Sequence, residues 1–389
     1  MTQRRQPGAV AALKVGLAVA LLVVAGCALG SIAPILDLEP RPGATAERPG
    51  GLGAADSVRY VIHVSVDGLR PDAVERLGAS LPAFVRLRTE GVWTHNARTD
   101  PDYSITLPNH AAQLTGRPVV GPSGHGWTEN VDPATGVTLH SNKGAYVASV
   151  FDGVHDAGRA TAAYVSKSKF SLFHVSYDAT HGAPDTTGAD DGRDKIDRFV
   201  YQADTQSLVA ELVADLGDDP AAYTFVHLRD PDAAGHVWTW NVRSGSRYMR
   251  AVRRSDARIG EILDAVESDA RLVGRTAVIV TADHGGSARH HRADRPLHYT
   301  VPFYVWGPGI DRADLYALNP EREDPGGARP GFAAERQPVR NGDAANLALA
   351  LLGLDPVPGS TIGRDDPLRL AAADTLDGAR PQAAVGQHP

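Results

Sequence analysis

Short, nearly continuous apolar runs are the feature that most constrains the fold of this chain. They are rich in Val, Ile and Thr and lie at 60–66, 160–166, 223–228, 276–281 and 301–306. Such runs are typical of parallel strands that are buried on both faces. Between them, apolar residues at three- and four-residue spacing predict helices over 144–157, 196–216, 246–267 and 343–352. This alternation predicts an α/β fold with a central, mostly parallel sheet and helices on both faces.

The N-terminal segment has a different composition. Basic residues at positions 4 and 5 precede an uncharged apolar run over 15–25, which ends at Gly26-Cys27. This arrangement resembles a bacterial lipoprotein signal, with residues 1–26 as the signal peptide and Cys27 as the lipidated residue. We therefore expect an extracytoplasmic protein that is lipid-anchored to the membrane, or secreted if Cys27 is not modified.

The remainder of the chain divides into three parts. Residues 27–57 are rich in Pro, Gly and Ala and predict a flexible tether. The predicted catalytic domain spans 58–365, and 366–389 form a predicted flexible tail.

Cysteine usage and charge exclude several classes of protein. Cys27 is the single cysteine, so a metal site must be built from His, Asp and Glu. The 39 basic and 46 acidic residues give a net charge of −7, which argues against binding to nucleic-acid duplexes. Nothing in the sequence indicates an obligate protein partner.

Three aspartates, Asp67, Asp232 and Asp283, follow predicted strands. In α/β sheets, ligands bind beyond the carboxyl ends of the strands. Each aspartate alone could belong to an ordinary turn, and a lone histidine is usually structural. Together with three histidines, however, they provide enough donors for two divalent transition metals. Those histidines are His236, His284 and His298.

The order and spacing of these motifs resemble the alkaline phosphatase superfamily, and within it the type I phosphodiesterase/nucleotide pyrophosphatase family. The resemblance runs from about Val61 to Thr361 and includes Thr106-Leu-Pro-Asn-His and His-Gly-Trp-Thr-Glu-Asn130. It implies an alkaline-phosphatase-like fold and two Zn²⁺ ions, or other divalent transition metals.

The resemblance also implies a role for each matching residue. Thr106 would be the nucleophile and a metal ligand, and Asn130 would donate a hydrogen bond to a phosphoryl oxygen. The backbone N–H of Leu107 could face the same phosphoryl group. The ligands of the first zinc would be Asp232, His236 and His298, and those of the second Asp67, Asp283 and His284.

The substrate class stays open between two kinds of phosphate ester. The neutral Asn130 favours phosphodiesters or nucleotide pyrophosphates. However, Lys167-Ser-Lys169 resembles the Lys-x-Arg pair of Thr-dependent bacterial monoesterases, with Lys instead of Arg in the second position. Phosphomonoester hydrolysis with Lys167 and Lys169 is therefore the alternative, and a non-catalytic binding lipoprotein ranks lower.

Other neighbours have structural interpretations. We expect Asn109 and His110 to pack or cap a helix start, and His227 to be a core histidine. His290 and His291 lie in a charged loop and are predicted to be solvated. The stretch at Thr106 lacks the Cys/Ser-x-Pro-x-Arg motif of sulfatases, which excludes that branch.

Overall fold

The computed structural model describes residues 58–185, 187, 192–292 and 294–372. The predicted signal peptide, Cys27, the tether and most of the predicted tail lie outside these residues. Among the helices that are described, none is both long enough and apolar enough to cross a membrane.

Eight strands form one sheet in the described part of the chain. All neighbouring strands are parallel except β7, which runs antiparallel to both β6 and β2. This architecture confirms the predicted mostly parallel α/β sheet. In spatial order the strands are β4 (Arg198–Tyr201), β3 (Thr161–Val165), β5 (Tyr223–Leu228), β1 (Tyr60–Val66), β6 (Thr276–Thr281), β7 (Thr300–Trp306), β2 (Val92–Arg98) and β8 (Ala313–Asp314).

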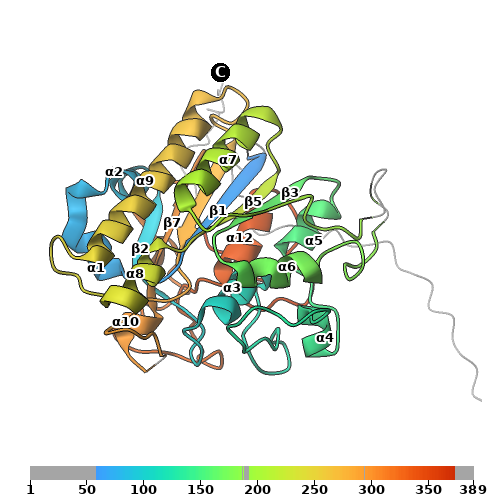
Figure 1. Ribbon diagram of the computed structural model, residues 1–389, viewed down its shortest axis with the longest axis horizontal. Helices are drawn as coiled ribbons and strands as arrows, with labels where there is room; N and C mark the ends of the chain where they lie inside the picture. The colour runs from blue at the N-terminus through green and yellow to red at the C-terminus, as the bar shows by residue number, and fades with distance from the viewer. Residues whose placement is uncertain (1–57, 186, 188–191, 293, 373–389) are drawn as a thin grey trace, which may run out of the picture. The chain divides into compact units, whose positions relative to one another are not determined.

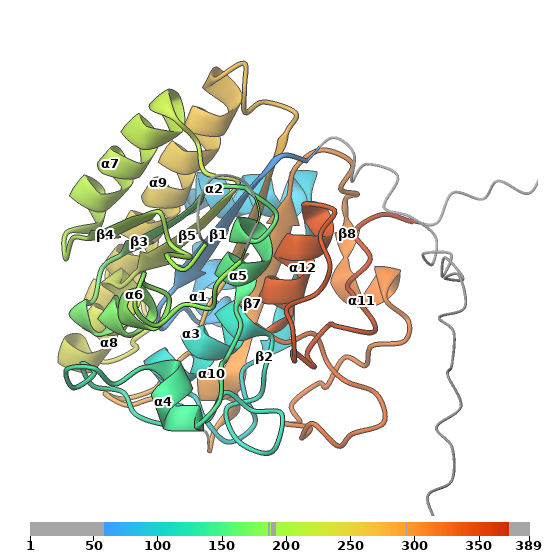
Figure 2. The ribbon, with the colours of Figure 1, turned by 90° about the vertical axis from the view of Figure 1, so that its right-hand side faces the viewer.

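Helices cover both faces of the sheet (Figure 1). On one face, α9 (Arg247–Ser268) packs against α2 (Pro82–Glu90) and α7 (Thr205–Asp218). On the other face, α12 (Asp343–Leu351) packs against α3 (Thr106–Thr115), and Figure 2 shows the sheet between these two layers. The shorter helices are α1 (Pro71–Leu77), α4 (Leu139–Lys143), α5 (Val150–His155), α6 (Ser171–Ser176), α8 (Asp230–Trp238), α10 (Pro296–Tyr299) and α11 (Leu315–Leu318), with 3₁₀ turns at Gly78–Ser80 and Ser168–Phe170.

The helix predicted over 196–216 is wrong in its first part. Residues 198–201 form the short edge strand β4, and α7 begins only at Thr205. The Asp204 side chain accepts a hydrogen bond from the backbone N–H of Ser207, which fixes this start. Similarly, Ser149 and Asp152 form a capping box, so α5 begins at Val150, six residues after the predicted start at 144. The sequence analysis also missed β2 and the helix α2 that precedes it.

The central strands place three aspartates at one edge of the sheet. β5, β1 and β6 are adjacent and parallel, and Asp67, Asp232 and Asp283 follow their carboxyl ends. Gly68 lets two of these chain segments approach closely: its φ is +71°, and a Cβ there would lie 2.9 Å from Cα of Asp232. The backbone N–H of Asp232 donates to the carbonyl of Asp67 at 3.0 Å. The turn after β1 therefore fixes the aspartates that follow β1 and β5 side by side.

Candidate active site

Three fully buried side chains, which we call the buried cluster, meet beyond β1 and β6: Asp67, Asp283 and His284. One potential ligand atom from each lies within 4.8 Å of the others. Asp283 Oδ1 accepts hydrogen bonds from the backbone N–H groups of Gly68 (3.0 Å) and His284 (2.9 Å). By contrast, Asp67 Oδ1 and Asp283 Oδ2 are buried without a hydrogen-bond partner. Such unpaired carboxylate oxygens are costly unless a cation binds them.

A second group, which we call the rim cluster, consists of Asp232, His236 and His291. Asp232 and His236 lie one helical turn apart on α8, with His236 Nε2 3.2 Å from Asp232 Oδ1. The His291 ring stacks on His284 at 3.7 Å and lies 5.0 Å from the ring of His236. Ligand atoms of Asp232, His284 and His291 lie within 4.8 Å of one another. The prediction of a solvated His291 is therefore wrong.

His291 is held by a contact that a loop sequence does not reveal. Its Nδ1 donates to the backbone carbonyl of Ser104 at 2.5 Å, which leaves Nε2 as the atom available for a ligand bond. A histidine-rich loop directly after the Asp283-His284 pair is the only signal that the sequence offered.

His298 takes a different position from the one that the resemblance implied. Its Nε2 lies 2.7 Å from Ser287 Oγ, its Nδ1 contacts the carbonyl of Arg292, and Asp294 lies 3.3 Å away. It makes no hydrogen bond or ion pair with Asp232 or His236 in the described structure. The geometry thus brings His291, and not His298, to these two residues.

Lys167 joins the buried and rim clusters. Its ammonium Nζ lies 2.5 Å from Asp67 Oδ2 and 2.6 Å from Asp232 Oδ2. Burial alone would raise the pKa of Asp67, but Lys167 and His227 hold this pKa well below its usual value. Burial would lower the pKa of Lys167, but the two carboxylates raise it instead. Lys167 therefore stays charged and forms an ion pair with one carboxylate of each cluster.

The predicted nucleophile lies at the start of α3. Thr106 Oγ1 is 3.4 Å from His284 Nε2, so the hydroxyl faces the buried cluster. His110 holds this first turn, because its Nδ1 lies 2.7 Å from the Thr106 carbonyl and its Nε2 lies 2.8 Å from Ser65 Oγ on β1. Asn109 Nδ2 donates to the carbonyls of Tyr103 and Ile105. Asn109 and His110 thus have the predicted structural roles.

Asn130 lies beside Thr106 with its amide oriented by two donors. The backbone N–H of Leu107 donates to Asn130 Oδ1 at 3.1 Å, and Lys169 Nζ lies 3.3 Å from the same oxygen. Nδ2 is then the free donor of this amide, because no described residue accepts a hydrogen bond from it. The N–H of Leu107, which could have faced a phosphoryl group, is already used to orient Asn130.

A hollow of about 300 Å³ opens over these groups. It is lined by Thr106, Asn130, Lys167, Ser168, Lys169, Tyr201, Arg229, Asp232 and His236. Its size is at the lower end of the range of ligand pockets in proteins. The predicted nucleophile Thr106, the predicted donor Asn130 and both predicted lysines therefore line one opening.

His227 has a role that the sequence analysis did not foresee. It is buried as predicted, but its Nε2 donates to Asp67 Oδ2 at 2.9 Å and its Nδ1 lies 3.0 Å from Ser166 Oγ. It therefore orients Asp67. The strand register could have revealed this contact, because His227 pairs with Ser65, two residues before Asp67.

The donor set fits divalent transition metals. Burial lowers the pKa of His284 to about 3 and also lowers that of His291, so both imidazoles are neutral, as metal ligands must be. The unpaired oxygens of Asp67 and Asp283 provide carboxylate ligands beside them. Burial raises the pKa of Asp283, and a bound cation would favour its anionic form. Oxygen and imidazole donors of this kind suit zinc and its first-row neighbours.

The family model for type I phosphodiesterase/nucleotide pyrophosphatase matches residues 61–331. The chain belongs to this family. GPI ethanolamine phosphate transferase 1 of Mus musculus is 28% identical over 337 residues, which cover 78% of this chain and 32% of that protein. Human ectonucleotide pyrophosphatase/phosphodiesterase family member 1 is 25% identical over 227 residues, 57% of this chain and 23% of that protein. The chain thus spans about a third or less of the length of these relatives.

Solved structures share the fold. Murine ectonucleotide pyrophosphatase/phosphodiesterase 5, as an inactive variant in complex with AMP, aligns with a TM-score of 0.52 at 15% identity, over 77% of this chain and 96% of that chain. A Vibrio parahaemolyticus protein of the alkaline phosphatase superfamily aligns with a TM-score of 0.52 at 17% identity, over 81% of this chain and 71% of that one. These neighbours and the sheet order confirm the alkaline-phosphatase-like fold, and the family to which the chain belongs is one of metal-dependent enzymes that act on phosphoesters.

Proposed function

We propose that this chain hydrolyses phosphodiesters or nucleotide pyrophosphates through a phospho-threonine intermediate at Thr106. The observation that carries the proposal is the position of Thr106 Oγ1, 3.4 Å from His284 Nε2 at the edge of a buried Asp-Asp-His cluster. Asn130 beside it is neutral, which suits the single negative charge of a diester. The AMP bound to the murine neighbour is consistent with a nucleotide substrate.

We assign one metal ion to Asp67, Asp283 and His284, and a second to Asp232, His236 and His291. Zinc is the ion we propose, and when bound it would lower the pKa of the Thr106 hydroxyl and stabilise charge on the phosphoryl and leaving oxygens. His291 takes the place that the resemblance assigned to His298, because of its contacts with His236 and His284.

The chemistry then follows from the residues around the hollow. Thr106 Oγ attacks the phosphorus, the bond to one ester oxygen breaks, and that alcohol leaves with a proton. Asn130 Nδ2 donates to a non-bridging oxygen. Water then attacks the phosphorus, the bond to Thr106 Oγ breaks, and the monoester and the threonine hydroxyl are released.

Thr106→Ala tests this assignment directly. With the variant zinc-loaded, we expect kcat/KM for bis-p-nitrophenyl phosphate to fall by about 10³-fold or more, since the covalent step is removed. Thr115→Ala, the same substitution at the other end of α3, is the matched control and should keep its activity. Equal activity of Thr106→Ala and the parent protein would refute the nucleophile.

Phosphomonoester hydrolysis is the second candidate. Lys167 and Lys169 line the same hollow as Thr106, and Lys169 Nζ donates to the Asn130 carbonyl at 2.8 Å. These cations could meet the extra charge of a monoester dianion. A higher kcat/KM for p-nitrophenyl phosphate than for its bis-ester would favour this candidate, and Lys169→Gln should then reduce the monoester rate selectively.

Transfer of the phosphoryl group to an alcohol is a third candidate reaction. It is favoured by the GPI ethanolamine phosphate transferases among the relatives. The phospho-threonine would then react with an alcohol instead of water. Product analysis in the presence of glycerol or ethanolamine distinguishes the two reactions, because transfer yields a new phosphodiester whereas hydrolysis yields only a monoester.

A further inference from the structure

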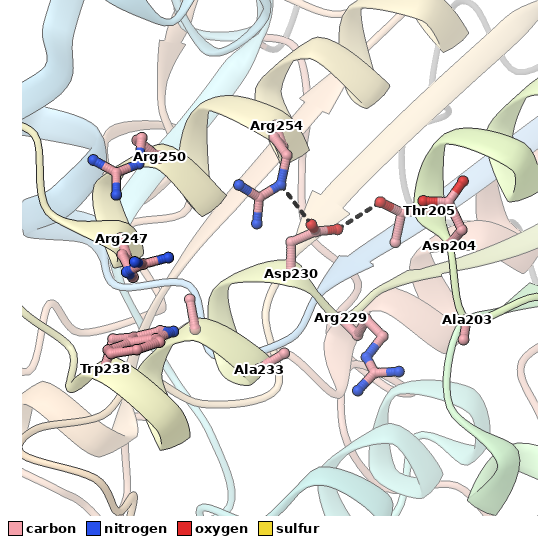
Figure 3. Close-up of a pocket in the computed structure, with 11 residues that line it drawn as sticks. Ala203, Asp204, Thr205, Arg229, Asp230, Ala233, Trp238, Arg247, Arg250 and Arg254 are labelled. Carbon is pink, nitrogen blue, oxygen red and sulfur yellow. Dashed lines mark hydrogen bonds and ion pairs between the residues drawn. The ribbon is translucent and has the colours of Figure 1, made fainter.

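A second hollow, of about 320 Å³, lies beside the site and is rich in arginine. We call it the arginine pocket. Four guanidinium groups line it, together with the ring of Trp238 (Figure 3). They belong to Arg229, before α8, and to Arg247, Arg250 and Arg254 on α9.

The positive charge of this pocket is not balanced by its own carboxylates. Asp230 accepts hydrogen bonds from Arg254 Nε (2.9 Å) and Thr205 Oγ1 (2.5 Å), and Asp204 caps α7. Among the described residues, no carboxylate forms an ion pair with the other three arginines. In a chain with a net charge of −7, such a concentration of unpaired arginine is a local exception. Arginine binds phosphate groups through two parallel hydrogen bonds.

One helix connects the pocket to the reaction site. Asp232 and His236 on α8 line the hollow at Thr106, whereas Asp230, Ala233, Ala234 and Trp238 on the same helix line the arginine pocket. Residues three and four apart share a helix face, so α8 is a thin wall between the two hollows. Arg229, at the start of this helix, lines both.

Trp238 adds a surface suited to an organic substituent. The residue is 52% exposed, and the guanidinium of Arg247 lies over the ring at 4.1 Å. Stacking holds this guanidinium in place without consuming its hydrogen-bond donors. The pocket therefore presents an oriented guanidinium group beside an exposed aromatic ring, and Arg229 lines both this pocket and the hollow at Thr106.

We propose that the arginine pocket binds a second anionic group, of the phosphate class, on the phosphoester whose phosphorus reacts at Thr106. This inference rests on the proposed function and narrows its substrate class to polyanionic phosphodiesters. Arg229 contacts the substrate between the two anions, and Arg247 and Arg250 bind the second one.

The test uses p-nitrophenyl phosphodiesters of alkanediols with two, four or six methylene groups, each ending in either a phosphate or a hydroxyl. For the zinc-loaded protein we expect kcat/KM to be about tenfold or more higher for the phosphate-ended ester at one of these lengths, as charge-assisted hydrogen bonds allow. The double variant Arg247→Gln/Arg250→Gln should lose this preference and keep kcat/KM for the hydroxyl-ended esters within about twofold. Arg253→Gln, on the same helix but outside the pocket, is the matched control and should keep the preference.

Several results would overturn the inference. One is an equal kcat/KM for both ester series at every length, and another is a preference that survives in the double variant. Competition by phosphatidylglycerol vesicles, without competition by soluble glycerol phosphate, would assign the pocket to a membrane headgroup instead.

If neither series is hydrolysed, the proposed function fails while the pocket remains testable by binding. Calorimetric titration of zinc-loaded Thr106→Ala with butanediol bisphosphate should then give about tenfold tighter binding than butyl phosphate. Equal affinities would refute the pocket as an anion site.

Discussion

The buried and rim clusters contain similar donors in different settings. Asp67, Asp283 and His284 directly follow core strands and have no exposed surface. In the rim cluster, His236 is on a short helix with 45% of its side chain exposed, and His291 is on a loop. Asp283 accepts hydrogen bonds from backbone N–H groups that directly follow the core strands. The rim histidines instead bond to the carbonyls of loop residues, His236 to Arg289 and His291 to Ser104. Under our proposal, the fully buried cluster would hold the metal beside Thr106, and the more exposed rim cluster would meet the substrate.

The largest expected effect tests the buried cluster. Asp283→Asn keeps an oxygen that can accept from the N–H groups of Gly68 and His284, so the fold should persist. It removes the carboxylate that would bind the metal, and we expect kcat/KM to fall by about 10³-fold with loss of bound metal. Metal analysis after dialysis and diesterase kinetics measure both. Unchanged metal content and activity would mean that this cluster is structural.

Lys167, which links the buried and rim clusters, gives the next largest expected effect. Lys167→Met leaves the carboxylates of Asp67 and Asp232 close together without their cation. We expect the metal-free variant to lose about 3 kcal/mol of unfolding free energy, and zinc to restore most of it. Urea unfolding with chelator and with zinc gives both values. An equal loss in the two conditions would show that Lys167 acts through packing and not through charge.

In the rim cluster, we expect a smaller loss of metal binding or activity. His291→Ala should weaken metal binding or kcat/KM by about 10- to 100-fold. His290→Ala, at the neighbouring position, is the matched control, and His298→Ala should have less effect than His291→Ala. If His298→Ala loses metal while His291→Ala does not, the assignment from the resemblance is right and ours is wrong.

The smallest effect lies outside both clusters. Burial raises the pKa of Asp256 to about 6, although its carboxylate accepts the backbone N–H of Phe84 at the start of α2. The neutral carboxyl is thus favoured in the folded state. Its stabilising contribution is complete below about pH 4 and is lost as the pH rises through about 6. Asp256→Asn should remove this loss, on the order of 1 kcal/mol, without changing activity. Unfolding free energies at pH 4 and pH 7 measure it.

The contrast between the buried and rim clusters also explains which residues could be predicted from the sequence. Continuous apolar runs identify the buried strands in the sequence, and Asp67 and Asp283 follow two of these runs. The fold and the buried cluster were therefore predictable. His291 was not, because its position depends on the carbonyl of Ser104, far away in the chain. β4 was missed since an edge strand of four residues carries too little periodicity to separate it from α7.

The Lys167 ammonium has a consequence for the order of events at the site. It contacts the same two carboxylates that we assign to the two metals, so it and the ions are rivals for one set of negative charges. Each bound ion would weaken the attraction of the two carboxylates for the Lys167 ammonium. The hollow that Lys167 lines also contains Thr106 and Asn130, where an incoming phosphoryl group supplies new negative charge. We therefore expect metal to bind first and the ester second, with the Lys167 ammonium then available to the incoming phosphoryl group.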